Sequence, residues 1–444
     1  MTTPSSTGDA IGLHAAARQR IEDRTATVCI VGQGYVGLPA AMRASEVGFP
    51  TIGYEVDKRR VDALGMGESY IGDVSDERLS AALASGYRPT AELGDLVGFD
   101  VAVITVPTPL RDGAPDLSYV ESAATQLARV LKAGALVVLE STTYPGTTRE
   151  LVVPILEADS GLRAGRDFFV GYSPERIDPG NATWTFENTP KVIGGLDEQS
   201  LELVGAFYTS LVDEVVPVAG LEEAELVKIL ENTFRHVNIA LVNELAMFAR
   251  GLDVDVWRAV DAAATKPFGF MPFRPGPGVG GHCLPIDPSY LSWRVRQHLG
   301  QPFRFVELAN DINEHMPDHV VTRITALLNE RSRSVRGTRI VLLGLTYKAN
   351  TSDFRESPSI RVAERLNTLG AELVGCDPHV PDGFESLVGV ELAPYDAETL
   401  AGADLVVVLV DHPEFDPAFI AEHSAVVFDT KGILRSVEFE GELL

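Results

Sequence analysis

The sequence predicts an α/β protein with two Rossmann-like, doubly wound parallel-sheet domains joined by a central region of long helices. Three observations lead to this prediction. Apolar runs alternate with helical stretches over residues 25–215, one long helical pattern covers residues 222–251, and strand–helix alternation returns after residue 332. Such alternation is typical of parallel sheets that are covered by helices. We expect a leader at 1–24, the first α/β domain at 25–215, the helical region at 216–332 and the second α/β domain at 333–444.

Elements of the first domain follow one another in a regular order. An apolar strand, residues 28–31, runs into a glycine turn, an alanine-rich helical stretch follows, and a second apolar run ends at Glu55. Further strand-like runs cover 100–107, 135–142 and 167–175, with helical stretches between them. Period-2 and short apolar runs bounded by turns predict strands, and 3.6-residue spacing predicts helices.

The middle of the chain has the residue pattern of long helices and not of alternating strands and helices. Residues 222–251 have helical apolar spacing on more than one side, and we expect Gly251 to cap this helix. A helix apolar on several sides packs against another subunit or against both flanking domains. After the polar, basic segment "NERSRSVRG" (329–337), four apolar runs predict the second sheet: "TRIVLLGLTYKAN", "AELVGCDP", "ADLVVVLVD" and "AVVFDTKG".

Composition excludes several classes of protein. The 444 residues include 63 acidic and 37 basic side chains, and the net charge of −26 repels nucleic acid and anionic membranes. No apolar run approaches the roughly 18 residues that a membrane span needs. The three cysteines, Cys29, Cys283 and Cys376, are far apart and suit neither a disulfide framework nor a metal site. We expect a cytoplasmic protein without metal, nucleic-acid or membrane partners.

Gly32, Gly34 and Gly37 form a G-x-G-x-x-G pattern directly after the first strand. The first glycine permits a tight turn, the second lets the backbone approach a pyrophosphate, and the third lets helix pack on strand. Glu55, at the end of the next strand, suits a ribose diol and repels a 2′-phosphate, which favours NAD over NADP. The basic run from Lys58 to Arg60 weakens that preference. The alternative is a glycine turn without a ligand.

Cys283 lies in the loop "GPGVGGHCLPIDP" (276–288), where little side-chain bulk surrounds it. It is open to three interpretations: a metal ligand beside His282, a loop cysteine without a role, or a nucleophile. No cluster of ligands has suitable spacing, whereas loop amides and basic groups favour a thiolate, so we predict a nucleophile. Asp287 is then placed to organise a proton or a water, or it caps the following helix.

Two further groups are candidates for catalysis. Lys228 and Asn232 lie four residues apart on the long helix, hence on one face, and could hold a developing oxyanion. The alternative is an ordinary solvated face. Glu175, in "SPER", follows a strand end, where catalytic groups of α/β sheets gather. Its alternative is a loop carboxylate paired with Arg176.

Six motifs together resemble one family. "VGQGYVGLP", "ESTTYPGTT", "SPERIDPGN", "LVKILENTFRHVNIALVNELA", "TKPFGFMPFRPGPGVGGHCLPIDPSYL" and "GLTYKANTSDFRESPSI" occur in the order seen in the UDP-glucose/GDP-mannose dehydrogenase family. The likeness runs from about residue 26 to the C-terminus. Within it, "ESTTYPGTT", "SPER" and "PFGFMPF" resemble UDP-N-acetylglucosamine 6-dehydrogenases of polysaccharide biosynthesis. UDP-glucose enzymes more usually show "STVP", "NPEF" and "GGSCFPKD", from which His282, Leu284 and Ile286 depart.

This resemblance implies a function for each domain. Residues 25–215 would bind NAD, 216–332 would carry catalysis and dimerisation, and 333–444 would bind a UDP-sugar. The implied reaction is a four-electron oxidation of the sugar C6 alcohol to a uronic acid, through a cysteine thiohemiacetal and thioester. The implied substrate is UDP-N-acetylglucosamine, and the implied assembly is a homodimer or higher homo-oligomer formed through the central helices.

The resemblance also assigns roles to residues. Cys283 would be the nucleophile, Lys228 and Asn232 would hold the oxyanion, Asp287 would partner Lys228 and water, Glu175 would be an acid/base, and Thr142 or its neighbour Thr143 would position water. The expected cofactor-binding residues are Gly32, Gly34, Tyr35, Val36, Gly37, Glu55, Arg60, Thr105, Pro107, Thr108 and Thr142. The expected substrate-binding residues are Glu175, Arg176, Lys228, Asn232, Arg235, Phe273, Arg274, Gly280, Lys348 and Arg355.

Four alternatives stay open at this point. UDP-glucose and UDP-N-acetylmannosamine are rival substrates. A hydroxyacid-type dehydrogenase that removes one hydride shares the glycine motif but gives Cys283 no task. A catalytically silent sensor of NAD or of a nucleotide-sugar would use the same pair of domains without chemistry.

Overall fold

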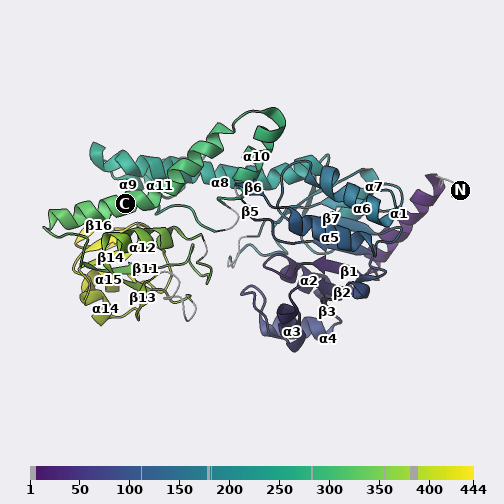
Figure 1. The fold of residues 1–444 in the computed structure, drawn as a ribbon, viewed down its shortest axis with the longest axis horizontal. Coiled ribbons are helices and arrows are strands. Elements are labelled where there is room, and N and C mark those ends of the chain that lie inside the picture. Colours follow the sequence, from purple (N-terminus) through teal and green to yellow (C-terminus); the bar gives the residue numbers. More distant parts are fainter. Residues whose placement is uncertain are drawn as a thin grey trace. The chain divides into compact units, whose positions relative to one another are not determined.

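Two α/β units make up the chain, Met1–Glu231 and Asn232–Leu444. The computed structural model describes residues 7–111, 113–177, 181, 183–281, 284–354, 356–380 and 389–444, with the side chains of 7–10 left out. Each unit is built around one sheet with helices on both faces (Figure 1). The predicted fold class, two doubly wound sheets with long helices between them in sequence, is confirmed.

The first unit holds an 8-stranded sheet in the order β10-β9-β8-β7-β4-β1-β2-β3. Its strands are β1 (Val28–Val31), β2 (Thr51–Tyr54), β3 (Arg88–Thr90), β4 (Val101–Ile104), β7 (Leu136–Leu139), β8 (Phe169–Tyr172), β9 (Lys191–Gly195) and β10 (Val215–Pro217). In register, Val28 of β1 pairs with Thr51 of β2 and Val101 of β4. A small antiparallel pair, β5 (Leu110–Arg111) and β6 (Ala114–Pro115), stands apart from this sheet.

One pair in this sheet departs from the prediction of a wholly parallel sheet. β9 runs antiparallel to β8, and β10 runs parallel to β9. No helix is assigned in the part of the β8–β9 connection that the structure describes. A parallel neighbour needs a crossover connection, usually a helix, whereas an antiparallel neighbour does not.

Helices cover both faces of the first sheet. They are α1 (Thr7–Glu22), α2 (Gly37–Glu46), α3 (Lys58–Met66), α4 (Asp76–Ala84), α5 (Ser118–Ala128), α6 (Val153–Ser160) and α7 (Glu198–Thr209). Successive residues of β1 serve opposite faces: Val28 and Ile30 join a core with α1, α2, α4 and α7, while Cys29 and Val31 join one with α5 and α6. Residues 7–22 of the expected leader form a helix, α1, whose Ile21 is buried in the first of these cores.

The second unit begins within α8 (Leu221–Ala249) and continues with α9 (Val256–Ala264), α10 (Asp287–Leu299) and α11 (Arg304–Glu330). The prediction that Gly251 caps the long helix was wrong. A 3-10 turn, Arg250–Leu252, tightens the end of the helix and moves the left-handed residue to Asp253. The indole nitrogen of Trp257, buried on α9, donates to the backbone oxygen of Leu444 over 2.9 Å.

The sheet of the second unit has the order β13-β12-β11-β14-β15-β16, and all its pairs are parallel over the residues that are described. Its strands are β11 (Arg339–Leu343), β12 (Glu372–Cys376), β13 (Glu391–Leu392), β14 (Leu405–Val408), β15 (Val427–Asp429) and β16 (Gly441–Leu443). α11 and α12 (Pro358–Leu369) pack on one face. α14 (Ala397–Ala401) and α15 (Pro417–His423) pack on the other.

Both sheets have a point where the strand order reverses. The chain goes from β1 to β2 on one side and then returns to β4 on the other, and it likewise goes from β11 to β12 and returns to β14. Ligands of open α/β sheets bind at the carboxyl ends of strands at such points. The carboxyl ends of β1 with β4, and of β11 with β14, are therefore the places to examine for chemistry.

Within the described ranges, no helix combines the length and the apolar character that crossing a membrane demands.

Candidate functional site

In the turn after β1, glycine is present at each of the three positions for a different physical reason. Gly32 has a φ of 95°, a conformation that side chains disfavour. A Cβ on Gly37, the first residue of α2, would collide with the Gly32 carbonyl oxygen. Gly34 has open space around it, with no atom within 4 Å of an added Cβ. The turn and the helix packing thus require the first and third glycines, while the second leaves the backbone accessible.

Thr105, at the end of β4, braces this turn. Its hydroxyl lies 2.9 Å from the carbonyl oxygens of both Val31 and Gly32. The two strands at the reversal point are therefore tied together at their carboxyl ends. Of the other predicted cofactor residues nearby, Tyr35 is exposed, Val36 directly precedes α2, Pro107 is exposed and Thr108 is half-buried.

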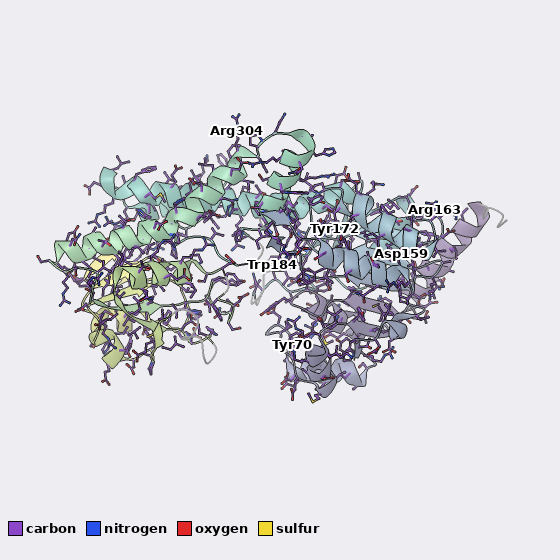
Figure 2. The ribbon with its side chains drawn as sticks, viewed as in Figure 1. Tyr70, Asp159, Arg163, Tyr172, Trp184 and Arg304 are labelled. Carbon is purple, nitrogen blue, oxygen red and sulfur yellow. The ribbon has the colours of Figure 1, made fainter. Side chains whose placement is uncertain are left out.

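Glu55 lies at the end of β2 and is only 7% exposed. Its carboxylate accepts hydrogen bonds from the backbone N–H groups of Gln33 and Asp57, each over 3.1 Å. A carboxylate has about four acceptor positions, so two of them stay available to a ribose diol. Arg60 lies 3.6 Å from Glu55 and also over the ring of Tyr70, which is labelled in Figure 2.

The two glycine roles separate in a mutational test. Gly37→Ala forces the turn and α2 apart, so we expect both a lower melting temperature and a loss of NAD binding. Gly34→Ala meets no protein atom, so we expect an unchanged melting temperature but NAD binding weakened at least about tenfold, because the methyl occupies the space of the pyrophosphate. Thermal unfolding and NAD titration measure the two effects. Unchanged NAD binding in Gly34→Ala would contradict this assignment.

The segment after β7 is anchored from α8. Glu225, fully buried, accepts from the backbone N–H groups of Gly146 and Thr148 and from the Thr148 hydroxyl. Burial raises the pKa of Glu225 to about 7, although these hydrogen bonds oppose the shift. The loop that contains Thr142 and Thr143 is thereby fixed to the helix that contains Lys228.

A cluster of buried charges lies at the ends of β7, β8 and β9. The Lys191 ammonium contacts the carboxylate of Glu140 and lies 3.3 Å from that of Glu175. The Tyr208 hydroxyl completes the group, 3.2 Å from Glu140. Burial, with a contribution from Lys228, lowers the pKa of Lys191 well below its usual value, and burial raises the pKa of Glu175. The protein thus holds Glu175 in surroundings where a carboxyl can exchange a proton.

Lys228 and Arg176 meet the backbone around Glu175. The Lys228 ammonium donates to the Glu175 carbonyl oxygen over 2.5 Å. Arg176 donates to Glu231 over 2.6 Å and to the Pro190 carbonyl oxygen over 2.5 Å. An ammonium has three donors, so Lys228 keeps two for a ligand, whereas Arg176 is occupied in holding the loop. The structure thus brings together three predicted residues from two separate motifs.

Lys191 is the residue on which this cluster depends. Lys191→Met removes the cation that contacts two buried carboxyl groups, and we expect the unfolding free energy of the protein to fall by about 3–5 kcal/mol. Lys58→Met is the matched control: its ammonium is 78% exposed and 3.9 Å from Glu92, so we expect a change within about 0.5 kcal/mol.

Urea unfolding, followed by circular dichroism, measures both variants. Equal stability of Lys191→Met and the unaltered protein would show that Lys191 does not stabilise the cluster.

In the second unit, Asn232 donates from its side chain to Asp287 over 2.5 Å. Asp287 is buried at the first turn of α10. These two predicted residues are therefore in contact. Cys283, His282 and Arg355 lie outside the described residues.

The glycine-rich loop before Cys283 has a packing reason for its composition. A Cβ on Gly280 would lie 2.7 Å from Pro358, and one on Gly281 would lie 2.7 Å from the Tyr347 ring. The loop is also tied at its start, where the Gly276 N–H donates to Asn243 over 3.0 Å. The absence of side chains at these glycines therefore lets the loop lie against the beginning of the second α/β domain. The sequence alone does not predict this contact.

The remaining predicted substrate residues have varied surroundings. Arg235 is exposed, and Phe273 is half-buried with its ring 5.8 Å from that of Phe234. Arg274 pairs with Asp261 over 2.5 Å. The Lys348 ammonium lies over the ring of Tyr347, beside the glycine-rich loop.

Sequence reasoning missed Glu140, Lys191, Tyr208 and Glu225. A signal existed for the first two, since each is a charged residue at the edge of an apolar strand: "VVLES" and "KVIGG". Their pairing, across 51 residues, leaves no local trace.

An open sheet whose first turn is shaped for a pyrophosphate, with a buried acid and a lysine at the same carboxyl edge, defines a dinucleotide-dependent oxidoreductase. Comparison with known families makes this specific. Residues 26–212 match the NAD binding domain, 222–315 the central domain and 341–436 the UDP binding domain of the UDP-glucose/GDP-mannose dehydrogenase family. The chain belongs to this family, whose members are NAD-dependent nucleotide-sugar dehydrogenases.

Individual relatives cover almost the whole chain. A UDP-N-acetyl-D-mannosamine dehydrogenase of Pyrococcus horikoshii is 37% identical over 390 residues, 87% of this chain and 90% of that protein. A UDP-N-acetyl-D-glucosamine 6-dehydrogenase of Pseudomonas aeruginosa is 35% identical, over 87% of this chain and 91% of its own. The solved structure of a UDP-D-ManNAc dehydrogenase from Pyrococcus horikoshii matches with a TM-score of 0.84 at 33% identity, covering 94% and 98% of the two chains.

Family membership confirms the predicted NAD cofactor and enzyme class, and it sets aside the silent sensor.

Proposed function

We propose that this enzyme oxidises the C6 alcohol of a UDP-N-acetylhexosamine to the uronic acid in two hydride transfers, with UDP-N-acetylglucosamine as substrate. The contact of Lys228 with Glu175, at the sheet edge that also holds the dinucleotide turn, is the observation that carries the proposal. This contact supports a site with a cation and a proposed acid/base beside the expected cofactor. The one-hydride alternative has no use for a cysteine.

Elimination among the cysteines supports Cys283 as the nucleophile. Cys29 and Cys376 are free but buried. Burial raises the pKa of Cys376 to about 12 and raises that of Cys29 further, so neither forms a thiolate readily. Free thiols also suit a reducing compartment, and we propose that the enzyme works in the cytoplasm.

The residues present fit NAD. Gly34 leaves the backbone open to the pyrophosphate, and Glu55 keeps acceptors for a ribose diol. Arg60 is drawn toward Glu55 and Tyr70, which reduces its value as a partner for a 2′-phosphate. NAD, when bound, accepts one hydride in each of the two oxidations.

Side chains of this protein bind the sugar C6 carbon and accept the protons that it releases. Loss of a hydride and a proton from the C6 alcohol leaves an aldehyde, with Glu175 as proton acceptor. The Cys283 sulfur adds to this aldehyde and gives a thiohemiacetal, from which the second hydride and proton leave to form a thioester. Water then adds to the thioester, the carbon–sulfur bond breaks, and the products are the carboxylate and the free thiol.

Lys228, Asn232 and Asp287 serve the tetrahedral stages of this sequence. We assign the oxyanion to Lys228 and Asn232, which are four residues apart in the sequence of α8. The Asp287 carboxylate fixes the orientation of the Asn232 amide through their hydrogen bond. We assign water positioning to Thr142 rather than Thr143, because the Thr143 hydroxyl is buried and hydrogen-bonded to Thr147, whereas Thr142 is partly exposed.

The names of two relatives support the proposed substrate class. The two curated relatives described above act, by their names, on UDP-N-acetylmannosamine and UDP-N-acetylglucosamine. A solved UDP-glucose dehydrogenase from Pyrobaculum islandicum also matches, with a TM-score of 0.83 at 30% identity over 94% of this chain and 97% of its own. The motifs "ESTTYPGTT", "SPER" and "PFGFMPF" favour the N-acetylglucosamine compound.

A substrate panel tests the reaction. With UDP-N-acetylglucosamine we expect two NADH per sugar consumed, because the aldehyde stays bound to sulfur, and a lower kcat/KM with UDP-N-acetylmannosamine and UDP-glucose. Absorbance of NADH, with sugar consumption measured by chromatography, gives the ratio. One NADH per sugar would favour the one-hydride alternative, and a preference for another sugar would change the substrate.

Variants of two residues test the chemistry. Cys283→Ser forms an ester that departs poorly, so uronic acid release should collapse while NAD binding survives. Lys228→Ala should lower kcat by about 10²-fold or more, through loss of an oxyanion donor. Full turnover by the serine variant, or an unchanged kcat for the alanine variant, would remove that residue from the mechanism.

We further propose that a second copy of the chain covers the apolar face of α8. Within the second unit, this face exposes Phe234, Leu241, Leu245 and Phe248 to between 38% and 54%. The spacings of seven, four and three residues keep them on one side of the helix. Apolar stripes of this kind mark subunit interfaces.

A charge placed in this stripe tests the interface. Leu241→Glu should shift the protein from dimer to monomer in analytical ultracentrifugation, because a carboxylate would be buried in an apolar contact. Leu369→Glu, at an exposed leucine of α12, is the matched control and should leave the dimer intact. A Leu241→Glu protein that keeps the assembly of the unaltered chain would show that this face is not the interface.

A further inference from the structure

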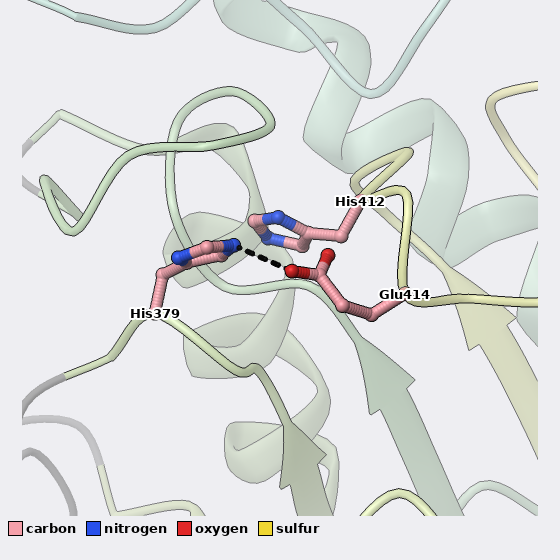
Figure 3. A group of neighbouring side chains, drawn as sticks. All are labelled: His379, His412 and Glu414. Atoms are coloured by element: carbon pink, nitrogen blue, oxygen red, sulfur yellow. Dashed lines mark ion pairs between the residues drawn. The ribbon is translucent and has the colours of Figure 1, made fainter. Parts of the chain in front are cut away.

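The carboxyl edge of the second sheet holds a group of side chains that the proposed oxidation does not use. His379 follows β12, while His412 and Glu414 follow β14. One ligand atom of each residue lies within 4.8 Å of those of the other two. Figure 3 shows His379 and Glu414 facing each other, with the His412 ring beside them.

Among the residues that the structure describes, two imidazole nitrogens of this group have no hydrogen-bond partner. Nδ1 of His412 and Nε2 of His379 are both shielded from solvent and make no hydrogen bond. The two ring centroids are only 4.9 Å apart. Buried polar atoms are rarely left without a partner, so Nδ1 of His412, close to the His379 nitrogen that faces Glu414, indicates a ligand that accepts ring-nitrogen lone pairs. A cation is such a ligand.

Asp377 organises both histidines. Nε2 of His412 lies 3.1 Å from its Oδ2 and 3.1 Å from the hydroxyl oxygen of Thr346. The His379 backbone N–H donates to its Oδ1 over 2.9 Å. A carboxylate behind one ring nitrogen fixes the ring and directs the lone pair of the other nitrogen outward, as in histidines that ligate metals.

Glu414 is the third member of the group, and its side chain is open to solvent. Its carboxylate lies 3.3 Å from Nε2 of His379. That separation matches the edge of a tetrahedron with metal–ligand bonds of about 2.1 Å. The His379 side chain is 29% exposed and that of Glu414 47% exposed, so a cation can enter from solvent and the two side chains can adjust to it.

We propose that His379, His412 and Glu414 bind one divalent transition-metal ion of the zinc class, with the fourth position open to solvent. Two imidazoles and one carboxylate suit Zn²⁺, while Mg²⁺ and Ca²⁺ prefer oxygen ligands alone. The site is not among those assigned above to the proposed substrate. It also escapes sequence reasoning, because the ligands come from two strand ends that only the fold brings together.

Zinc titration tests the site. The full-length protein is used with Cys283→Ser, so that the candidate nucleophile does not bind zinc itself, and the readout is competition with a chromophoric chelator. We expect one Zn²⁺ per chain. His379→Ala and Glu414→Gln, both at side chains with solvent access, should each weaken binding at least about tenfold, because each removes a ligand.

Two controls keep the result interpretable. His315→Ala, on α11, removes a histidine that is 61% exposed and outside the cluster, and binding should not change. Thermal unfolding shows that each variant is folded, and Co²⁺ in place of Zn²⁺ should give the visible absorption of a tetrahedral nitrogen–oxygen site. Failure to bind zinc, or equal affinity in His379→Ala, Glu414→Gln and the parent protein, would overturn the proposal.

Discussion

The burial of Lys191 between two carboxylates is the interaction on which the arrangement of the first unit's site depends. An ammonium removed from water is tolerated only where carboxylates face it, and Glu140 and Glu175 do so from the ends of β7 and β8. Because β9 carries Lys191 between them, the ends of three strands are held together. Glu175 is thereby fixed where Lys228 reaches its carbonyl oxygen. The position of the proposed acid/base is thus a consequence of charge compensation inside the sheet.

The same sheet edge joins two tasks that a dehydrogenase must combine. The glycine turn needs an accessible backbone, and Gly34 provides it. The catalytic groups need a fixed backbone. Glu225 fixes the loop after β7, because its carboxylate accepts hydrogen bonds from the backbone N–H groups of Gly146 and Thr148. The accessible backbone after β1 and the fixed backbone after β7 therefore lie at the same edge of one sheet, with β4 between the two strands, and each is produced by particular residues.

Local features of the sequence predicted much of this. The apolar run 28–31, the glycines after it and the acid at Glu55 are close in sequence and obey short-range rules, so strand, turn and helix followed from them. The sequence likewise predicts that Lys228 and Asn232 share one helical face, since this follows from their spacing within a single helix. Contacts between distant segments were not predicted. β9 begins with a buried lysine and did not read as a strand, and the partners Glu140 and Lys191 become visible only when the sheet is assembled.

We propose that the sulfur of Cys283 holds the half-oxidised sugar until the second hydride has left. The most direct measurement is mass spectrometry of the enzyme quenched during turnover and digested to peptides. We predict a sugar-derived adduct on the peptide that contains Cys283. An adduct on a different side chain, or free aldehyde as the final product, would contradict it.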